Sequence, residues 1–251
     1  GQGARWVLDD PKFAEFKPDS VFALHNLPGY PLGQVIVGDG VFASASQGLI
    51  IELEGATSHA AEPNRGNSPA LAVAELINAL STVPQRFTAL HEAAQVTVIH
   101  ARIGEVAFGT SPGSGVVMAT LRAHSQDVMD ILRRRCVTLA RSIAAAWSLE
   151  VKLKDVERFP STANDSKCVA IVRAAANELG LSPAAPLYPF PWSEDFGHFT
   201  AAFPGALFGL GAGEHTPALH HPHYDFPDAL IETGVRLMAR IARLAASESK
   251  N

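Results

Sequence analysis

The sequence predicts an α/β protein in which one α/β domain is interrupted by a smaller α+β domain. Two observations predict this class. The middle third of the 251 residues reads as strand, helix, strand, strand, helix, strand, and the flanks carry short apolar runs accompanied by helices. We therefore expect a domain split between residues 1–45 and 159–251, with a second domain inserted at 46–158.

The inserted domain is expected to open with a strand at 48–54 (GLIIELE), whose apolar run ends in apolar/polar alternation. A helix start follows at Asn67 and Ser68 before Pro69, and we expect Pro84 to stop the helix. Apolar residues recur along it at helical spacing, at Leu71, Ala74, Ile77 and Leu80.

Two strands follow at 94–103 and 115–124, joined by a Gly/Ser/Pro-rich turn. Ser125 is expected to cap a long helix with one apolar side, and 149–156 (LEVKLKDV) predicts the last strand. This order is the split βαβ plan, a four-stranded antiparallel sheet with both helices on one face. Such a sheet leaves a face or an edge uncovered, so pairing with a second copy is expected.

The flanking segments predict a parallel sheet. Residues 21–24 (VFAL) end at His25, and 205–210 (GALFGL) end at Gly211, like buried strands that deliver loops at their carboxyl ends. Asp165 and Asp228 are expected to cap two helices of this domain. Their expected apolar residues are Val169, Val172, Ala176 and Leu179 in the first and Ile231, Val235, Met238, Ile241 and Leu244 in the second.

Composition excludes some classes of protein. The formal charge is −5, which provides no positive field for phosphate backbones, so nucleic acid is not expected as a partner. No apolar run of about 18 residues and no signal-like start is found, so we expect no membrane partner and a cytoplasmic location. Cys136 and Cys168 are then expected to be free thiols.

The stretch 218–226 (ALHHPHYDF) raises the question of a metal site, because neutral imidazole is a common metal ligand. His25 and His220 both follow apolar segments, where open α/β sheets gather their ligands, so the two can converge on one ion. Alternatively, each caps a strand or bonds a backbone carbonyl. His221 and His223 cannot both join His220 at one ion, so at least one is expected to face solvent or to support the site.

His59 lies in a loop (GATSHAAEPNRGNSP) where its imidazole could bond a substrate oxygen, or be an ordinary surface histidine. Glu194 and Asp195, in WSEDFGHF, are adjacent carboxylates near a helix start. Capping of that helix is an equally good interpretation for them.

Five blocks in order resemble the metal-dependent amidohydrolases of the aminoacylase and carboxypeptidase-G type, nearest to the hippurate and auxin-conjugate hydrolases. The blocks are ALHNLPGYPLG, GATSHAAEPNRGNSP, SEDFGHF, PGALFGLGAG and ALHHPHYDF. The resemblance implies a zinc-peptidase-like catalytic domain with an inserted ferredoxin-like lid and dimerisation domain. It also implies two divalent metal ions (zinc, manganese or cobalt), a homodimer, and hydrolysis of N-acyl amino acids or small peptides.

The resemblance also implies roles for single residues. His25 and His220 resemble metal ligands, and His59 resembles the lid histidine that steadies the oxyanion of the tetrahedral intermediate, often in the partner's active site. Glu194 would lie near the metal centre in a supporting role.

Two departures from the family pattern stand out. Many relatives have an Asn-Val-Ile-Pro segment that contacts substrate, where this chain has Gly109 to Pro112. The family's other metal ligands and its Glu-Glu base pair lie upstream of the strand that leads to His25. The opening GQGARWVLDD resembles the sequence just after that pair, so we expect the N-terminal part of the catalytic domain to be absent.

With at most two ligands and no base, we expect weak metal binding and no turnover by this chain alone. It would then be a fragment, a truncated product, or half of a site that another polypeptide completes. Two alternatives remain: a non-catalytic dimerising or ligand-binding module, and an isolated metal-storage or structural site formed by the histidine cluster.

Overall fold

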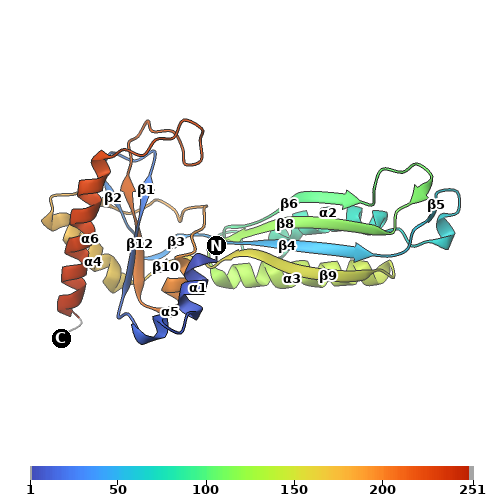
Figure 1. Cartoon of the computed structure of the whole chain (residues 1–251), viewed down its shortest axis with the longest axis horizontal. Helices are drawn as coiled ribbons and strands as arrows, with labels where there is room; N and C mark the ends of the chain where they lie inside the picture. Colours follow the sequence, from blue (N-terminus) through green and yellow to red (C-terminus); the bar gives the residue numbers. More distant parts are fainter. Residues whose placement is uncertain (1, 249–251) are drawn as a thin grey trace. The chain divides into compact units, whose positions relative to one another are not determined.

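A computed structural model describes residues 2–248 (Figure 1). The chain divides into two compact units. Unit 1 contains the residues up to Ser44 and those from Pro160 onward, and unit 2 contains Ala45–Phe159. Within the described residues, no helix combines the length and the apolar character needed to cross a bilayer.

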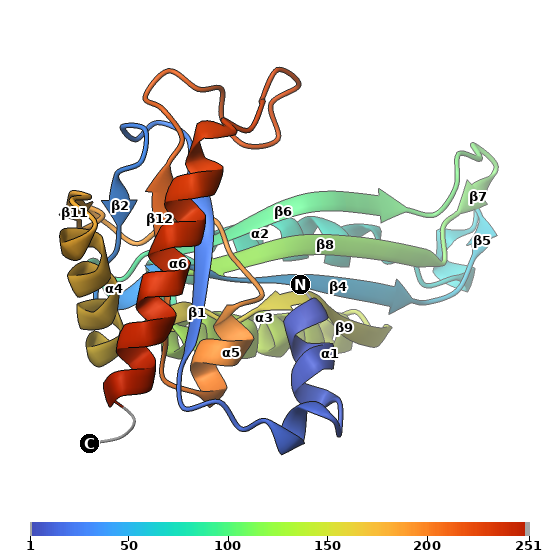
Figure 2. The ribbon, with the colours of Figure 1, turned by 60° about the vertical axis from the view of Figure 1, so that its left-hand side comes forward.

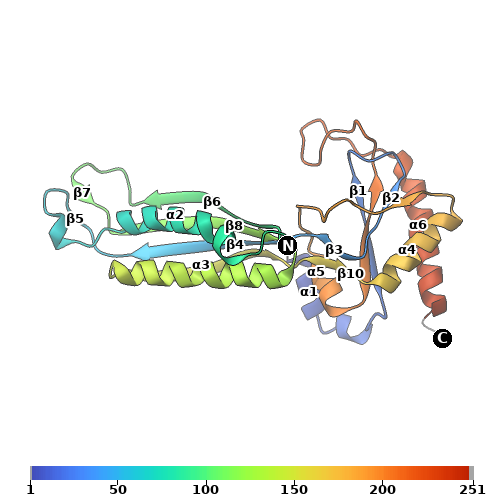
Figure 3. The same cartoon turned by 180° about the vertical axis from the view of Figure 1, so that it is seen from behind.

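Unit 2 is built on a sheet of four long strands in the order β6-β8-β4-β9, and every neighbouring pair is antiparallel. The strands are β4 (Ala45–Glu54), β6 (Ala94–Ile103), β8 (Ser114–Ala123) and β9 (Glu150–Phe159). Helices α2 (Ala70–Phe87) and α3 (Gln126–Ala146) both cover the same face of this sheet (Figure 3). The expected βαββαβ order is confirmed.

Apolar and charged residues alternate along β4, and this alternation determines which face of the unit 2 sheet is buried. Leu49, Ile51 and Leu53 are at most 1% exposed and face the helices, whereas Glu52 and Glu54 are exposed on the other face. Ser125 caps α3 as expected, because its side chain accepts a hydrogen bond from the Val128 amide at 3.3 Å. Unit 2 also contains three short elements: β5 (Ser58–His59), η2 (Pro63–Arg65) and β7 (Thr110–Ser111).

Helix α2 differs from its prediction at its end and on its buried face. It continues through Pro84 to Phe87: the proline lacks its own amide donor, but the helix does not end there. Leu71 is 58% exposed and Ala74 is exposed as well, so the expected stripe is partly wrong. Neighbouring apolar residues provide the buried stripe at the same period: Ala72, Val73, Leu76, Leu80 and Val83.

Unit 1 contains a mixed sheet in the order β1-β12-β2-β11, in which β1 and β12 are parallel. Its strands are β1 (Val21–Leu27), β2 (Val35–Ile36), β11 (Pro183–Ala184) and β12 (Gly205–Gly211). Helices α4 (Ser166–Glu178) and α6 (Ala229–Glu248) pack around Phe208 and Leu210 on one face. Leu207 points to the other face, into a cluster with Phe42.

The remaining elements of unit 1 are β3 (Gly40–Ala43), β10 (Thr162–Asn164), α1 (Gly3–Asp9), η1 (Phe13–Glu15) and α5 (Gly197–Ala202). Strands β3 and β10 form a separate antiparallel pair. Asp165 caps α4 as expected, since its side chain accepts from the amides of Lys167 and Cys168. Cys136 and Cys168 are both buried, and neither forms a disulfide among the described residues.

Burial of β1 and α6 differs from the expectation. Strand β12 is buried throughout, but β1 is only half-buried from Val21 to Asn26, because β1 is the edge strand of its sheet. On α6, Ile231 and Val235 are 55% and 64% exposed, whereas Leu237 and Ile241 are buried. The apolar surface of α6 is therefore wider than the part its neighbours cover.

Asn164 is a buried polar residue whose side chain hydrogen-bonds the backbone of β12. Its side-chain amide donates to the carbonyls of Leu207 at 2.9 Å and Gly38 at 3.0 Å, and its side-chain oxygen accepts from the Leu207 amide at 2.8 Å. The residue is 6% exposed. One side chain thus provides the hydrogen bonds that a neighbouring strand would otherwise provide.

Candidate functional site

His25 lies near the carboxyl end of β1, opposite Gly209 of β12. Its Nδ1 is 2.7 Å from the Asn26 carbonyl oxygen, and its Nε2 is 3.5 Å from Oε1 of Glu194. The Trp192 ring lies against the imidazole at a centroid distance of 5.3 Å. These three contacts fix the orientation of a half-buried ring.

The environment of His25 favours a positive charge at its imidazole. The hydrogen bond to Glu194 raises the pKa of His25 above its ordinary value, burial opposes this, and the Asn26 carbonyl and the Glu194 charge add to the increase. With Nδ1 on a backbone carbonyl, Nε2 is the nitrogen that faces the carboxylate. A metal-ligating histidine has the same arrangement, with one nitrogen held by a carbonyl and the other directed at the ion.

The segment that carries Glu194 is anchored at two places. The Ser44 amide donates to the carbonyls of Phe190 and Trp192, both at 3.0 Å, and the Ser44 hydroxyl donates to the Phe190 carbonyl at 2.6 Å. Further along, the Asp195 carboxylate accepts from the Ala4 amide at 2.9 Å, at the start of α1. Helix α5 has no side-chain cap, so neither carboxylate caps the helix that follows them.

The histidine-rich loop leaves the carboxyl end of β12 and runs to α6, as the loop beyond β12 in Figure 2 shows. It is tied to β1 next to His25, because the Asn26 side-chain amide donates to the Tyr224 hydroxyl. His220 in this loop is exposed and has φ +66°, a left-handed conformation that is uncommon outside glycine. The His221 and His223 rings pack on each other at 5.5 Å.

His59 belongs to unit 2, whereas His25, Glu194 and His220 belong to unit 1. It is exposed in β5 opposite Thr110 of β7, and its Nδ1 accepts from the Ala61 amide at 3.1 Å. The Ala60 amide donates to the Gly109 carbonyl at 3.0 Å. The stretch that departs from the family pattern is therefore the direct neighbour of His59.

The side chains around His25 fit a metal ion only in part. His25 and Glu194 provide one imidazole and one carboxylate. Among residues 2–248, no three His, Cys, Asp or Glu side chains are grouped closely enough to hold an ion. An open catalytic zinc site takes three protein ligands, so the described residues do not complete such a site.

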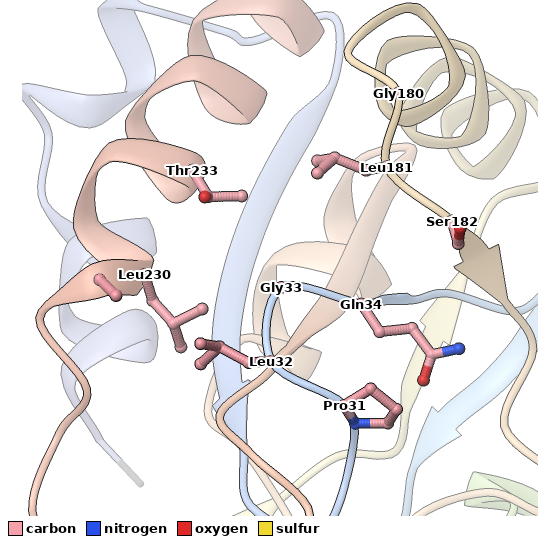
Figure 4. A pocket seen from close by; sticks show the side chains of 10 residues that line it. Pro31, Leu32, Gly33, Gln34, Gly180, Leu181, Ser182, Leu230 and Thr233 are labelled. Carbon is pink, nitrogen blue, oxygen red and sulfur yellow. The ribbon is translucent and has the colours of Figure 1, made fainter.

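A separate cavity of about 530 Å³ lies in unit 1 between the end of α4 and the start of α6 (Figure 4). Its wall has no charged side chain and none of the predicted site residues. The lining residues are Pro31, Leu32, Gly33, Gln34, Gly180, Leu181, Ser182, Ala229, Leu230 and Thr233.

Sequence reasoning missed three residues that contact the site. Asn26, Trp192 and Tyr224 were not singled out. A signal existed for each, since Asn26 follows His25, Trp192 lies two residues before Glu194, and Tyr224 belongs to the 218–226 stretch. The Asn26–Tyr224 contact joins residues 198 apart in the sequence, and Trp192 is also distant in sequence from His25, so no local pattern encodes these contacts.

The model of the peptidase family M20/M25/M40 matches residues 1–244 of this chain. The chain belongs to this family. The resemblance drawn from the five sequence blocks is thereby confirmed.

The curated relatives include proteins that are named as deacetylases of N-acetylated amino acids. The N-acetyl-L-cysteine deacetylase of Bacillus subtilis is 29% identical over 253 residues, covering 100% of this chain and 59% of the relative. The N-acetyldiaminopimelate deacetylase of Brevibacillus brevis is 27% identical, covering 96% of this chain and 64% of the relative. The chain therefore spans less than two thirds of these proteins.

Solved structures agree on the fold. A candidate aminohydrolase from methicillin-resistant Staphylococcus aureus matches with a TM-score of 0.85 at 18% identity, over 96% of this chain and 62% of that one. A Bacillus subtilis protein described as a dinuclear metal-binding peptidase of the M20 family matches with a TM-score of 0.76 at 20% identity, over 96% of this chain and 61% of that one. The expected fold class is confirmed.

Proposed function

We propose that this chain is part of a metal-dependent amidohydrolase that cleaves the amide bond of an N-acyl amino acid or a small peptide. The observation that carries the proposal is the His25–Glu194 pair, with Nδ1 of the histidine held by a backbone carbonyl. The deacetylase relatives support the substrate class. Two divalent ions, zinc, manganese or cobalt, are the proposed cofactors, and one structural neighbour is described as dinuclear.

The proposed roles follow from where each side chain lies. His25 would bind a metal through Nε2, while the Asn26 carbonyl and Trp192 hold its ring in place and Glu194, which faces Nε2, supports the site. His220 is the proposed second ligand, on the loop that Tyr224 ties to Asn26. His59 is exposed and has one ring nitrogen, Nε2, available to donate to an oxyanion when Nδ1 accepts from Ala61.

We further propose that residues 2–248 alone do not turn over substrate. They provide two proposed ligands, and a catalytic site needs a third ligand and a base from other polypeptide. Unit 2 is the proposed lid and homodimer contact, because its four-stranded sheet has one face without helices and two edges without a partner strand among the described residues.

Metal titration of the chain tests the ligand assignment. Co²⁺ is expected to bind weakly and to quench Trp192 fluorescence, because the indole lies 5.3 Å from the His25 ring. His25→Ala should abolish the quenching, and the control His91→Ala, at an exposed histidine outside the site, should not. Unchanged Co²⁺ affinity in His25→Ala would instead favour an isolated site in the histidine cluster.

Hydrolysis assays test the activity. The chain and a version extended to family length would be incubated with N-acetyl-L-cysteine, N-acetyldiaminopimelate and hippurate in the presence of Co²⁺ or Zn²⁺. We expect turnover only from the extended version. Turnover by the chain alone would refute its proposed inactivity, and an extended, folded, metal-loaded protein that cleaves no N-acyl substrate would refute the function.

A further inference from the structure

The loop between β12 and α6 is attached at two places to β1 and the turn that follows β1. Near the start of the loop, the Gly213 carbonyl accepts from the Gly29 amide at 2.9 Å. Further along, the Tyr224 hydroxyl accepts from the Asn26 side-chain amide. The stretch between these two attachments contains His220.

Tyr224 is the residue through which the outer part of this loop meets the rest of unit 1. Of residues 220–226, all of which the structure describes, only Tyr224 is half-buried, and the others are exposed to solvent. An exposed stretch with few buried contacts opens at a low free-energy cost. The position of this stretch therefore depends on the contact that Tyr224 makes with Asn26.

Two consecutive turns connect His220 to Tyr224. The His221 amide donates to the Ala218 carbonyl at 3.0 Å, and the Tyr224 amide donates to the His221 carbonyl at 2.9 Å. His220 occupies the third position of the first turn with φ +66°, a conformation that favours glycine. A strained backbone of this kind persists only where the surrounding structure holds it, so the turns need support from outside.

The attachment at Tyr224 leaves the face of the sheet that carries the His25 ring free. Leu24 packs into the core beside α6, whereas Ala23 packs on the opposite face. Because neighbouring side chains of a strand alternate between the two faces, Asn26 points to the α6 face and His25 to the other. Tyr224 thus holds the loop at the end of β1 without occupying the space in front of the imidazole.

We propose that Tyr224 is a positioning residue, whose hydroxyl, held by Asn26, fixes the two turns and with them His220 relative to the end of β1. This inference deepens the proposed function and rests on it, because His220 is the proposed second metal ligand. Tyr224 acts through the loop and contacts neither an ion nor the substrate. Replacing a residue that orients a metal ligand typically lowers metal affinity by about 10–100-fold.

Amide exchange in the complete, metal-free chain tests the positioning role directly. Tyr224→Phe keeps the ring and removes the hydroxyl, so exchange of the His221 amide, followed by NMR, is expected to speed up by about 5-fold, the effect of losing one ordinary hydrogen bond. Asn26→Leu removes the donor and should have the same effect. The double variant should exchange no faster than either single variant, because the two residues share one interaction.

Co²⁺ binding, followed by quenching of Trp192 fluorescence, connects the position of the loop to the site. Tyr224→Phe is expected to weaken Co²⁺ binding by about 10-fold. In a His220→Ala background the same substitution should have no further effect, because Tyr224 acts through His220. A general loss of stability would weaken binding in both backgrounds. The matched control is Tyr188→Phe, at a tyrosine that is 71% exposed and outside this loop, and it should change neither exchange nor binding.

Two outcomes would overturn the proposal. One is exchange of the His221 amide in Tyr224→Phe equal to that in the wild type. The other is a loss of Co²⁺ affinity in Tyr224→Phe that is equally large with and without His220. A different result concerns the proposed function: if His220→Ala leaves the Co²⁺ affinity unchanged, the ligand assignment fails, while faster exchange in Tyr224→Phe still supports the role of Tyr224 in holding the loop.

Discussion

Replacing Asn164 with aspartate is expected to destabilise unit 1 in a way that depends on pH. The substitution keeps the shape of the side chain but removes both N–H donors that face the carbonyls of Leu207 and Gly38. A neutral carboxyl still donates once, so one buried carbonyl loses its partner, at a cost of about 1–3 kcal/mol. An ionised carboxylate in the same place would face two carbonyl oxygens.

The free energy of keeping the introduced carboxyl neutral sets the upper limit of the pH-dependent effect. Keeping an aspartate neutral at about pH 7.5, when its pKa in the unfolded chain is about 3.9, costs about 5 kcal/mol. The pKa of the introduced carboxyl is raised in the folded state, so stability is greatest below the unfolded pKa and is lost as pH rises toward the folded one. The loss relative to wild type should therefore grow between about pH 4 and about pH 7.5, by up to about 5 kcal/mol.

Urea denaturation at these two pH values, followed by circular dichroism, measures the effect. The matched control is Asn78→Asp, because Asn78 also donates to a backbone carbonyl, that of Ala74, but is exposed to water on α2. The control should change stability by less than about 1 kcal/mol. A loss below about 1 kcal/mol in Asn164→Asp at both pH values would refute the role assigned to the Asn164 side chain.

Three further predictions concern the core and one tight contact. Burial raises the pKa of the Cys136 thiol to about 12, and Cys168 is also buried, so a disulfide reagent at about pH 8 should titrate no thiol in the folded protein and two after unfolding; rapid reaction of either thiol would contradict this. Leu121→Ala, at a fully buried position of β8, should lower the free energy of unfolding by about 2–5 kcal/mol in urea titrations. Gly55→Ala places a Cβ 2.0 Å from the Asn67 backbone oxygen, so thermal denaturation should show a clear loss of stability, whereas an unchanged midpoint would exclude the close approach.

Most of the element order could be predicted from the sequence because it depends on local signals. The caps at Ser125 and Asp165 and the alternation in β4 act within a few residues, and the structure has them where they were expected. The stop at Pro84 failed because a proline removes one helical hydrogen bond and weakens a helix without always ending it; here three helical residues follow it.

Predictions of burial and of contacts failed where partners distant in sequence decide the outcome. Ile231 and Val235 fit a buried stripe by period alone, but what covers them depends on the neighbours of α6. The Asn26–Tyr224 hydrogen bond and the Trp192–His25 contact likewise join separate loops. Family resemblance pointed to His25 and Glu194, and the structure brings these two together.

The junctions of unit 2 have a consequence for how such a protein can be rearranged. The chain leaves unit 1 after Ser44 and returns at Pro160, and close to these junctions Ala43 and Thr162 are partners in the β3–β10 pair. A linker of a few residues would bridge the two cut ends if unit 2 were excised. Unit 2 could therefore be removed, or exchanged for another domain by evolution or by design, without changing the path of the chain that holds His25.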